Sequence, residues 1–119
     1  MLCTGMTKPA IYAALLLMAS VATAQGAADQ SELAQRSGCL ACHGGNTMRI
    51  GPAFKEISAK YANQPNAASL LAQHIVAGTG TKGVGWMQQG KATLQAMPPN
   101  GHVTADNAVK LATWILESK

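Results

Sequence analysis

The sequence is poor in aromatic and charged side chains, and it contains few cysteines. Aromatic residues make up 4% of its 119 residues and charged residues 12%. A chain of this length forms one small domain with a marginal hydrophobic core. Its three cysteines exclude a dense disulfide framework. No basic stripe interleaved with aromatic residues is present, so nucleic acid is not expected as a partner.

The apolar run near the N-terminus, residues 11–19, is too short to span a bilayer. Lys8 precedes it, and Ala22-Thr23-Ala24 matches the small-x-small rule for signal-peptide cleavage. We therefore expect residues 1–24 to be a secretory signal peptide and 25–119 to be the mature domain, without a membrane span. An uncleaved anchor is the alternative. No twin arginine is present, which favours the general secretory route to the periplasm.

Cleavage would simplify both the cysteine count and the charge. Cys3 would leave with the signal, so the mature chain would keep only Cys39 and Cys42. Loss of Lys8 would leave 8 basic residues against 5 acidic ones, a net charge of +3. The mature chain would therefore be mildly basic and would have no thiol outside one short motif.

That motif is Cys39-Leu40-Ala41-Cys42-His43, a C-x-x-C-H pattern typical of c-type haem attachment. Two intervening residues place the thiols about one helical turn apart, which suits thioether bonds to the two haem vinyl groups. The histidine follows directly and can bind the iron. The motif thus predicts one covalent haem c, and a large apolar cofactor would supply the core volume that the composition lacks.

Three other interpretations of the motif are weaker. A thioredoxin-like redox pair should follow a strand in a βαβ unit, whereas a helical stretch precedes Cys39. A zinc site needs two more ligands, and the other histidines, His74 and His102, lie far along the chain. We expect both to be surface or otherwise satisfied residues. A disulfide between Cys39 and Cys42 would not explain His43.

The remaining pattern is helical throughout. A capping box at Asp29 and Glu32 predicts a helix from about Gln30 to Arg36, which Gly38 ends. Gly51-Pro52 is expected to open a second helix. Its apolar face comprises Phe54, Ile57 and Tyr61.

Two further helices follow later in the chain. Asn66 is expected to cap the third, Ala67 to Ala77, with apolar residues Leu70, Leu71, Ile75 and Val76. Thr104 is expected to cap the last helix. Its inward stripe is Ala108, Leu111, Ala112 and Ile115, flanked by Trp114. Residues 78–83 match G-x-G-x-x-G but follow a helix rather than a strand, so we interpret them as a turn.

Haem iron needs a second axial ligand opposite His43, and the thioether of methionine is the partner that raises the potential in cytochromes c. The mature chain offers Met48, Met87 and Met97. Met97 is favoured because Pro98 and Pro99 stiffen the backbone directly after it. Met87 stays open as a rival. Met48, five residues after His43, is expected to be a packing residue.

Together, the C-x-x-C-H motif, Gly51-Pro52, the run Met97-Pro98-Pro99-Asn100 and a final helix with Trp114 resemble the bacterial class I monohaem cytochromes c. The resemblance covers roughly residues 29–119 and implies an all-α fold of four or five short helices around the haem. It also implies that the Pro52 carbonyl accepts a hydrogen bond from His43. Trp86 would donate to a haem propionate, and Asn100 would contact the Met97 sulfur.

The function that this resemblance implies is periplasmic one-electron transfer by a monomeric carrier. Donors would be quinol-oxidising complexes or dehydrogenases, and acceptors terminal oxidases or nitrite reductases. The alternative is the cytochrome c subunit of a periplasmic oxidoreductase complex. Peroxidase activity would need an open iron site, which Met97 would block, and sensing would need an output domain. The lysines at positions 55, 60, 82 and 91 either steer acidic partners or are simply solvated.

Overall fold

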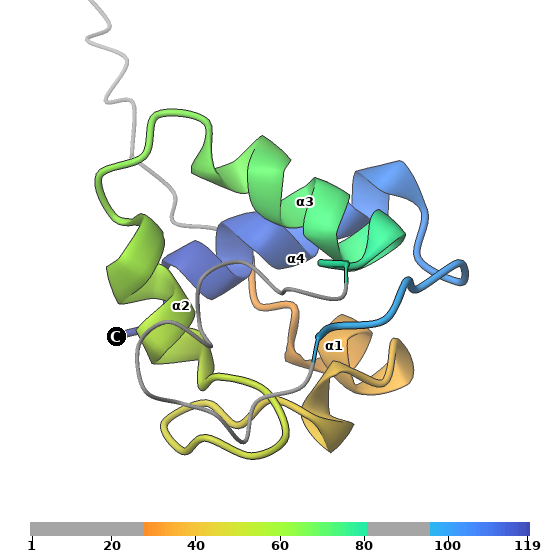
Figure 1. Ribbon diagram of the computed structural model, residues 1–119, viewed down its shortest axis with the longest axis horizontal. Helices are drawn as coiled ribbons and strands as arrows, with labels where there is room; N and C mark the ends of the chain where they lie inside the picture. Colours follow the sequence, from red (N-terminus) through yellow and green to blue (C-terminus); the bar gives the residue numbers. More distant parts are fainter. Residues whose placement is uncertain (1–27, 81–95) are drawn as a thin grey trace, which may run out of the picture.

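The computed structural model describes residues 28–80 and 96–119 (Figure 1). Within these residues the chain forms four α-helices: α1 (Ser31–Arg36), α2 (Phe54–Tyr61), α3 (Ala67–Ala77) and α4 (Ala105–Leu116). A short 3-10 helix, η1 (Cys39–Ala41), follows α1. The described part contains no strand beyond an isolated bridge between His43 and Met48. The all-α prediction is confirmed.

The start of α1 differs from the expected capping box. Gln30 is the N-cap residue, and Asp29 lies one position earlier. The Asp29 carboxylate accepts hydrogen bonds from the backbone N–H and the hydroxyl of Ser31, at 2.9 and 3.1 Å. The Glu32 carboxylate oxygen Oε1 instead lies 4.0 Å from Nε of Arg36, one helical turn further along. The predicted box was therefore wrong by one register position, although Asp29 does satisfy a free N–H at the helix start.

Helix α2 begins later than the sequence suggested. Ala53 is its N-cap and Phe54 its first residue, so Pro52 precedes the helix instead of opening it. The Glu56 carboxylate accepts a hydrogen bond from the Ala53 backbone N–H at 3.1 Å, which supports this later start. The Gly51-Pro52 backbone instead lies against the His43 ring.

Helix α3 has the predicted bounds. Asn66 is its N-cap residue, but the side chain makes no capping hydrogen bond. Leu71 and Ile75 are buried as expected, whereas Val76 is 37% exposed.

Helix α4 follows the prediction closely. The Thr104 hydroxyl accepts a hydrogen bond from the Asn107 N–H at 3.2 Å. The inward stripe is fully confirmed, because its members are all buried: Ala108, Leu111, Ala112 and Ile115.

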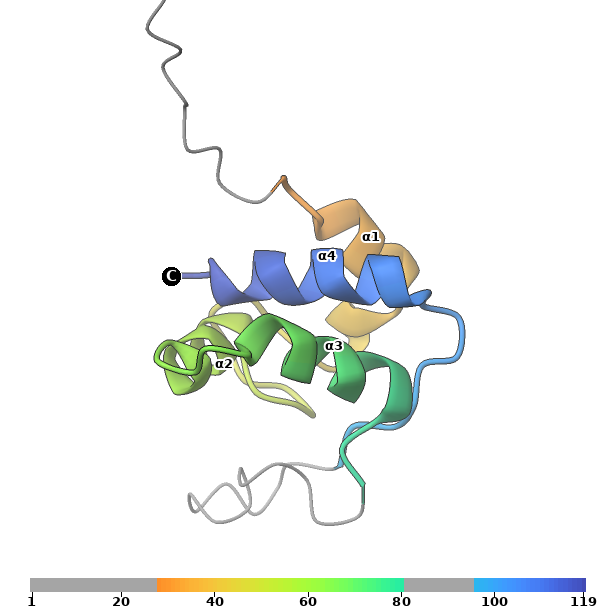
Figure 2. The ribbon, with the colours of Figure 1, turned by 90° about the horizontal axis from the view of Figure 1, so that it is seen from above.

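Helix α4 lies at the centre of the molecule. Figure 2 shows α3 running alongside α4 in the opposite direction, with α2 near one end of α4 and α1 near the other. Helix α4 contacts α3 most extensively, then α2, and α1 least.

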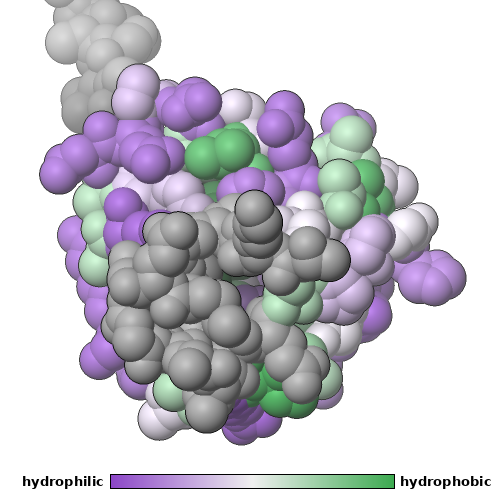
Figure 3. Space-filling model, viewed as in Figure 1, coloured by the Kyte–Doolittle hydropathy of each residue, from purple (hydrophilic) through white to green (hydrophobic). Residues whose placement is uncertain are grey.

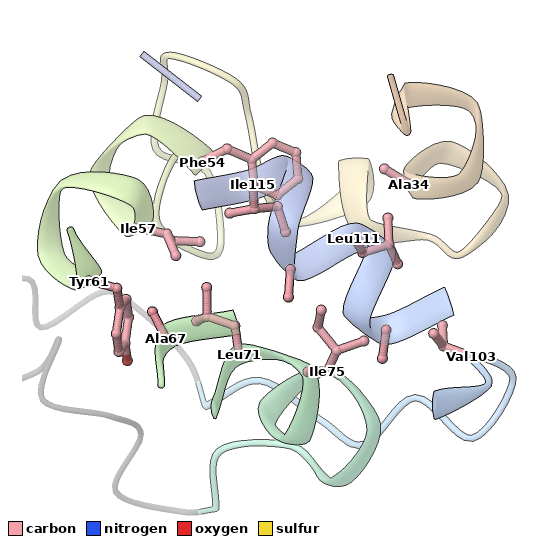
Figure 4. Packing of buried hydrophobic residues seen from close by; sticks show 13 residues of the cluster. Ala34, Phe54, Ile57, Tyr61, Ala67, Leu71, Ile75, Val103, Leu111 and Ile115 are labelled. Atoms are coloured by element: carbon pink, nitrogen blue, oxygen red, sulfur yellow. The ribbon is translucent and has the colours of Figure 1, made fainter. Parts of the chain in front are cut away.

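One continuous hydrophobic core joins all four helices (Figure 4). Leu111 is its largest fully buried side chain. Partly buried apolar residues pack against it, among them Leu40, Met97 and Trp114. The core members are Ala34, Phe54, Ile57, Tyr61, Ala67, Leu71, Ala72, Ile75, Val103, Ala108, Leu111, Ala112 and Ile115.

The described surface on the face seen in Figure 3 is largely hydrophilic, with hydrophobic residues in small separate patches. Among residues 28–80 and 96–119, no helix has the length and apolar character needed to cross a membrane.

Candidate haem-binding site

The C-x-x-C-H motif is placed by the end of α1 and the 3-10 turn that follows it. Gly38 adopts a left-handed conformation, with φ of 76°, which only glycine adopts without strain. The chain then tightens over η1, where the backbone N–H groups of Cys42 and His43 both donate to the Cys39 carbonyl, at 3.2 and 2.9 Å. This turn sets the two half-buried cysteines one helical turn apart, with His43 adjoining the second.

The His43 ring is oriented by the predicted contact with Pro52. Its Nδ1 lies 2.7 Å from the Pro52 carbonyl oxygen. A carbonyl can only accept, so Nδ1 carries the proton. Burial lowers the pKa of His43, and the hydrogen bond to Pro52 partly opposes that shift. A neutral ring with its proton on Nδ1 leaves the Nε2 lone pair free, which is the form that binds a metal.

Two neighbours fix the plane of the same ring. Phe54, the first residue of α2, stacks on it with centroids 5.5 Å apart and an angle of 18°. Gly51 faces it closely, because a Cβ there would lie 2.7 Å from the ring Cε1 and 3.0 Å from Nδ1. Phe54 also meets Trp114 edge-on, at 5.5 Å and 68°, so the histidine is braced against α2 and α4. The role of Gly51 could not be predicted from the sequence, since nothing local to this glycine signals a long-range contact.

The loop between His43 and α2 is tied back onto the motif. The Gly51 N–H donates to the Cys42 carbonyl at 2.8 Å, and the Phe54 N–H donates to the Gly44 carbonyl at 2.9 Å. The Arg49 guanidinium donates to the Leu40 carbonyl at 3.2 Å. Met48 is 44% exposed and pairs with His43 in an isolated bridge, so its side chain is not part of the buried core; that it is a packing residue and not an iron ligand stays a prediction.

The segment that carries Met97 is held against the C-terminal end of α3. The Met97 N–H donates to the Thr79 hydroxyl at 2.9 Å, and the Thr79 N–H donates to the Met97 carbonyl at 3.0 Å. Gly78, with φ of 76°, passes so close that a Cβ would lie 2.7 Å from the Met97 carbonyl oxygen. Met97 itself is half-buried and packs against the core.

Asn100 links the Met97 segment to α1. Its side-chain Nδ2 donates to the Ser37 carbonyl at 2.9 Å, and its Oδ1 accepts from the His102 N–H at 3.3 Å. One N–H of the amide is therefore bound to the residue that ends α1. The predicted contact with the Met97 sulfur could use only the second N–H and stays a prediction.

The other sequence-predicted residues are distributed as follows. Trp86, Met87, Lys82 and Lys91 lie outside the described residues. His74 is half-buried, with its pKa lowered by burial, and His102 is exposed as expected.

The competing interpretations of the motif find no support in the described part of the chain. Among these residues no group of three or more His, Cys, Asp or Glu side chains could hold a metal ion, so no complete zinc set is present. The helix α1, and not a strand, precedes the cysteines, unlike a thioredoxin-like motif. Burial chiefly raises the pKa of Cys39, and the nearby Cys42 raises it further, whereas redox-active cysteines have a lowered pKa.

These residues fit a covalently bound haem. Two half-buried thiols stand one turn apart, the neighbouring imidazole is held in the tautomer that leaves Nε2 free, and a half-buried thioether lies on the fixed segment. Cys39 and Cys42 would hold the group, and His43 and Met97 could supply ligands to its iron.

Comparisons with known proteins agree with this fit. The cytochrome c family model matches residues 27–119. Cytochrome c-551 of Pseudomonas aeruginosa is 40% identical over 111 residues, covering 91% of this chain and 97% of that protein. Cytochrome c-552 of Nitrosomonas europaea is 41% identical over 107 residues, with 90% of each chain covered.

The fold comparison leads to the same family. The crystal structure of wild-type Nitrosomonas europaea cytochrome c552 superposes with a TM-score of 0.62 and 39% identity, covering 74% of this chain and 98% of that one. The chain belongs to the cytochrome c family, whose members are electron-transfer proteins and not enzymes, and it carries one covalent haem c through the motif that contains Cys39 and Cys42.

Proposed function

We propose that this chain is a periplasmic one-electron carrier whose haem c has His43 and Met97 as axial ligands, shuttling electrons between respiratory redox proteins. The observation that carries the proposal is the 2.7 Å contact between His43 Nδ1 and the Pro52 carbonyl oxygen. It fixes the tautomer, raises the basicity of the imidazole and presents one ring nitrogen to iron. A histidine held in this way beside two spaced thiols is prepared for axial ligation.

The rigid surroundings of both ligands support electron transfer. When bound, the haem supplies the iron that is oxidised and reduced by one electron. The chain supplies an imidazole braced by Phe54 and the Pro52 carbonyl, and a methionine whose backbone is bound to Thr79, just after α3. Ligands that stay in place in both oxidation states keep structural rearrangement small, which favours fast exchange.

The test of axial ligation is absorption spectroscopy of the Met97→Ala variant, with Met48→Ala as the matched control. Wild type should give a low-spin spectrum with the weak near-infrared band of thioether bound to ferric iron. Met97→Ala should lose that band and have a lower reduction potential, since methionine ligation raises it. Met48→Ala should keep both, because Met48 is 44% exposed. A high-spin wild-type spectrum that binds CO readily would contradict the proposal, and an unaffected band in Met97→Ala would move the ligand to Met87.

The location and the partners follow from the same proposal. Export with cleavage after Ala24 would give a periplasmic mature chain, and the intact mass of the periplasmic protein checks the cleavage site. We expect a monomer that accepts electrons from a quinol-oxidising complex or dehydrogenase and passes them to a terminal oxidase or nitrite reductase.

Lys55 is exposed, and the mature chain carries a net charge of +3 (8 basic against 5 acidic residues), so an acidic partner surface would suit it. Stopped-flow oxidation should slow as ionic strength rises; a flat rate would dismiss this steering.

A further inference from the structure

The segment around Met97 has few backbone groups with which it can be fixed. Pro98 and Pro99 carry no N–H, so Met97 and Asn100 provide the backbone donors between positions 97 and 100. One donor binds the last turn of α3 and the other binds Thr79, two residues after the helix ends. The Asn100 N–H donates to the Val76 carbonyl at 3.2 Å, and the Met97 N–H donates to the Thr79 hydroxyl at 2.9 Å.

The second of these bonds is the unusual one, because its acceptor is a side chain. Thr79 returns a hydrogen bond from its own N–H to the Met97 carbonyl at 3.0 Å. The two residues therefore hold each other at two points, and one of the two depends on a hydroxyl group. Gly78 admits this approach by lacking a Cβ that would lie 2.9 Å from the Pro99 nitrogen.

We propose that Thr79 is a positioning residue for Met97, and that its hydroxyl oxygen keeps the methionine on the iron by fixing the Met97 backbone. The inference rests on the proposed function, since it requires Met97 to be the axial ligand. Without the hydroxyl, the Met97 N–H loses its acceptor, and the Asn100 N–H is left as the one bound backbone donor between positions 97 and 100. The methionine then leaves the iron more often, and external ligands compete with it more successfully.

The test uses three variants of the haem-loaded protein. Thr79→Val removes the acceptor and keeps the side-chain size, while Thr79→Ser keeps the hydroxyl. Thr113→Val is the control, because the Thr113 hydroxyl donates to the Val109 carbonyl at 2.9 Å within α4, away from the Met97 segment. Imidazole binding to the ferric protein should tighten about two- to tenfold in Thr79→Val, the equivalent of one net hydrogen bond. Thr79→Ser and Thr113→Val should bind imidazole as wild type does.

A second readout does not depend on the iron. Hydrogen exchange of the Met97 amide should be faster in Thr79→Val than in wild type by a similar factor, and unchanged in Thr113→Val. If wild type shows the thioether band but Thr79→Val leaves both imidazole affinity and Met97 exchange unchanged, the positioning role is overturned and Met97 ligation stands. If wild type lacks the band, the proposed ligand and the positioning role fall together.

Discussion

Replacing Gly51 by alanine tests how tightly the structure surrounds His43. Gly51 has no positive φ, so its backbone conformation is open to alanine, and any effect must come from the added methyl group. That methyl would lie 2.7 Å from the ring Cε1, 3.0 Å from Nδ1 and 3.2 Å from Nε2. All three distances are shorter than the 3.4 Å at which ordinary van der Waals contact begins.

The size of the effect follows from these distances. To lengthen the distance between the new methyl group and the ring Cε1 from 2.7 Å to 3.4 Å, the His43 ring and the Gly51 backbone must move apart by about 0.7 Å. Phe54 blocks retreat of the ring on one side, and any shift of Gly51 also moves Pro52. The 2.7 Å hydrogen bond leaves the favourable range once it lengthens by about 0.5 Å. Overpacking of this kind costs about 1–3 kcal/mol.

The assay is reversible urea unfolding of the haem-loaded protein. Gly51→Ala should lower the midpoint with the slope unchanged, which corresponds to a loss of about 1–3 kcal/mol. Gly45→Ala is the matched control in the same loop, since a Cβ at Gly45 meets nothing within 4 Å and its φ is not positive. The control should be neutral or slightly stabilising. Equal stability of the two variants would refute the close contact between Gly51 and His43.

Three further substitutions test other parts of the structure. Gly78→Ala should weaken the near-infrared thioether band more than Gly80→Ala does. Both glycines have positive φ, but only a methyl group at position 78 would clash with the Met97 carbonyl. Equal spectra of the two variants would contradict this contact. Leu111→Ala removes a fully buried side chain and should lower the free energy of unfolding by about 2–5 kcal/mol. Val109 is 48% exposed, so Val109→Ala should change this free energy by less than about 0.5 kcal/mol. Calorimetry of the two variants measures the difference. Asn100→Asp replaces the amide that donates to the Ser37 carbonyl by a carboxylate, which can only accept. The variant should lose about 1–3 kcal/mol in its free energy of unfolding, measured in urea. The same change at exposed Asn63 should be near neutral, and equal losses would argue against the Ser37 contact.

Local patterns predicted the elements whose signals lie within a few residues of each other. The bounds of α3, the Thr104 cap and the buried stripe of α4 all follow from spacing and capping chemistry. The expected start of α2 failed for a different reason. Gly51 and Pro52 look like a helix opening, but the Pro52 carbonyl is nine residues from the histidine that it binds, and that contact keeps both residues out of the helix.

In the candidate site, too, the contacts within a short stretch could be predicted from the sequence, and the contacts between distant residues could not. The spacing of Cys39, Cys42 and His43 is visible in five consecutive residues. The contact between Thr79 and Met97 joins residues 18 apart, and that between Ser37 and Asn100 joins residues 63 apart. No helical or strand periodicity relates such positions, so only the folded backbone brings them together.

The central place of α4 has a consequence for the order of assembly. This helix supplies four buried residues and packs against α1, α2 and α3, yet it is the last helix in the sequence. Until α4 is in place, the earlier helices lack the surface on which they converge. Cys39 packs against the core that this helix completes, so the surroundings that leave Cys39 and Cys42 half-buried are complete only when the C-terminal helix docks. The position of one helix along the chain thus sets when the core beside the cysteine motif can form.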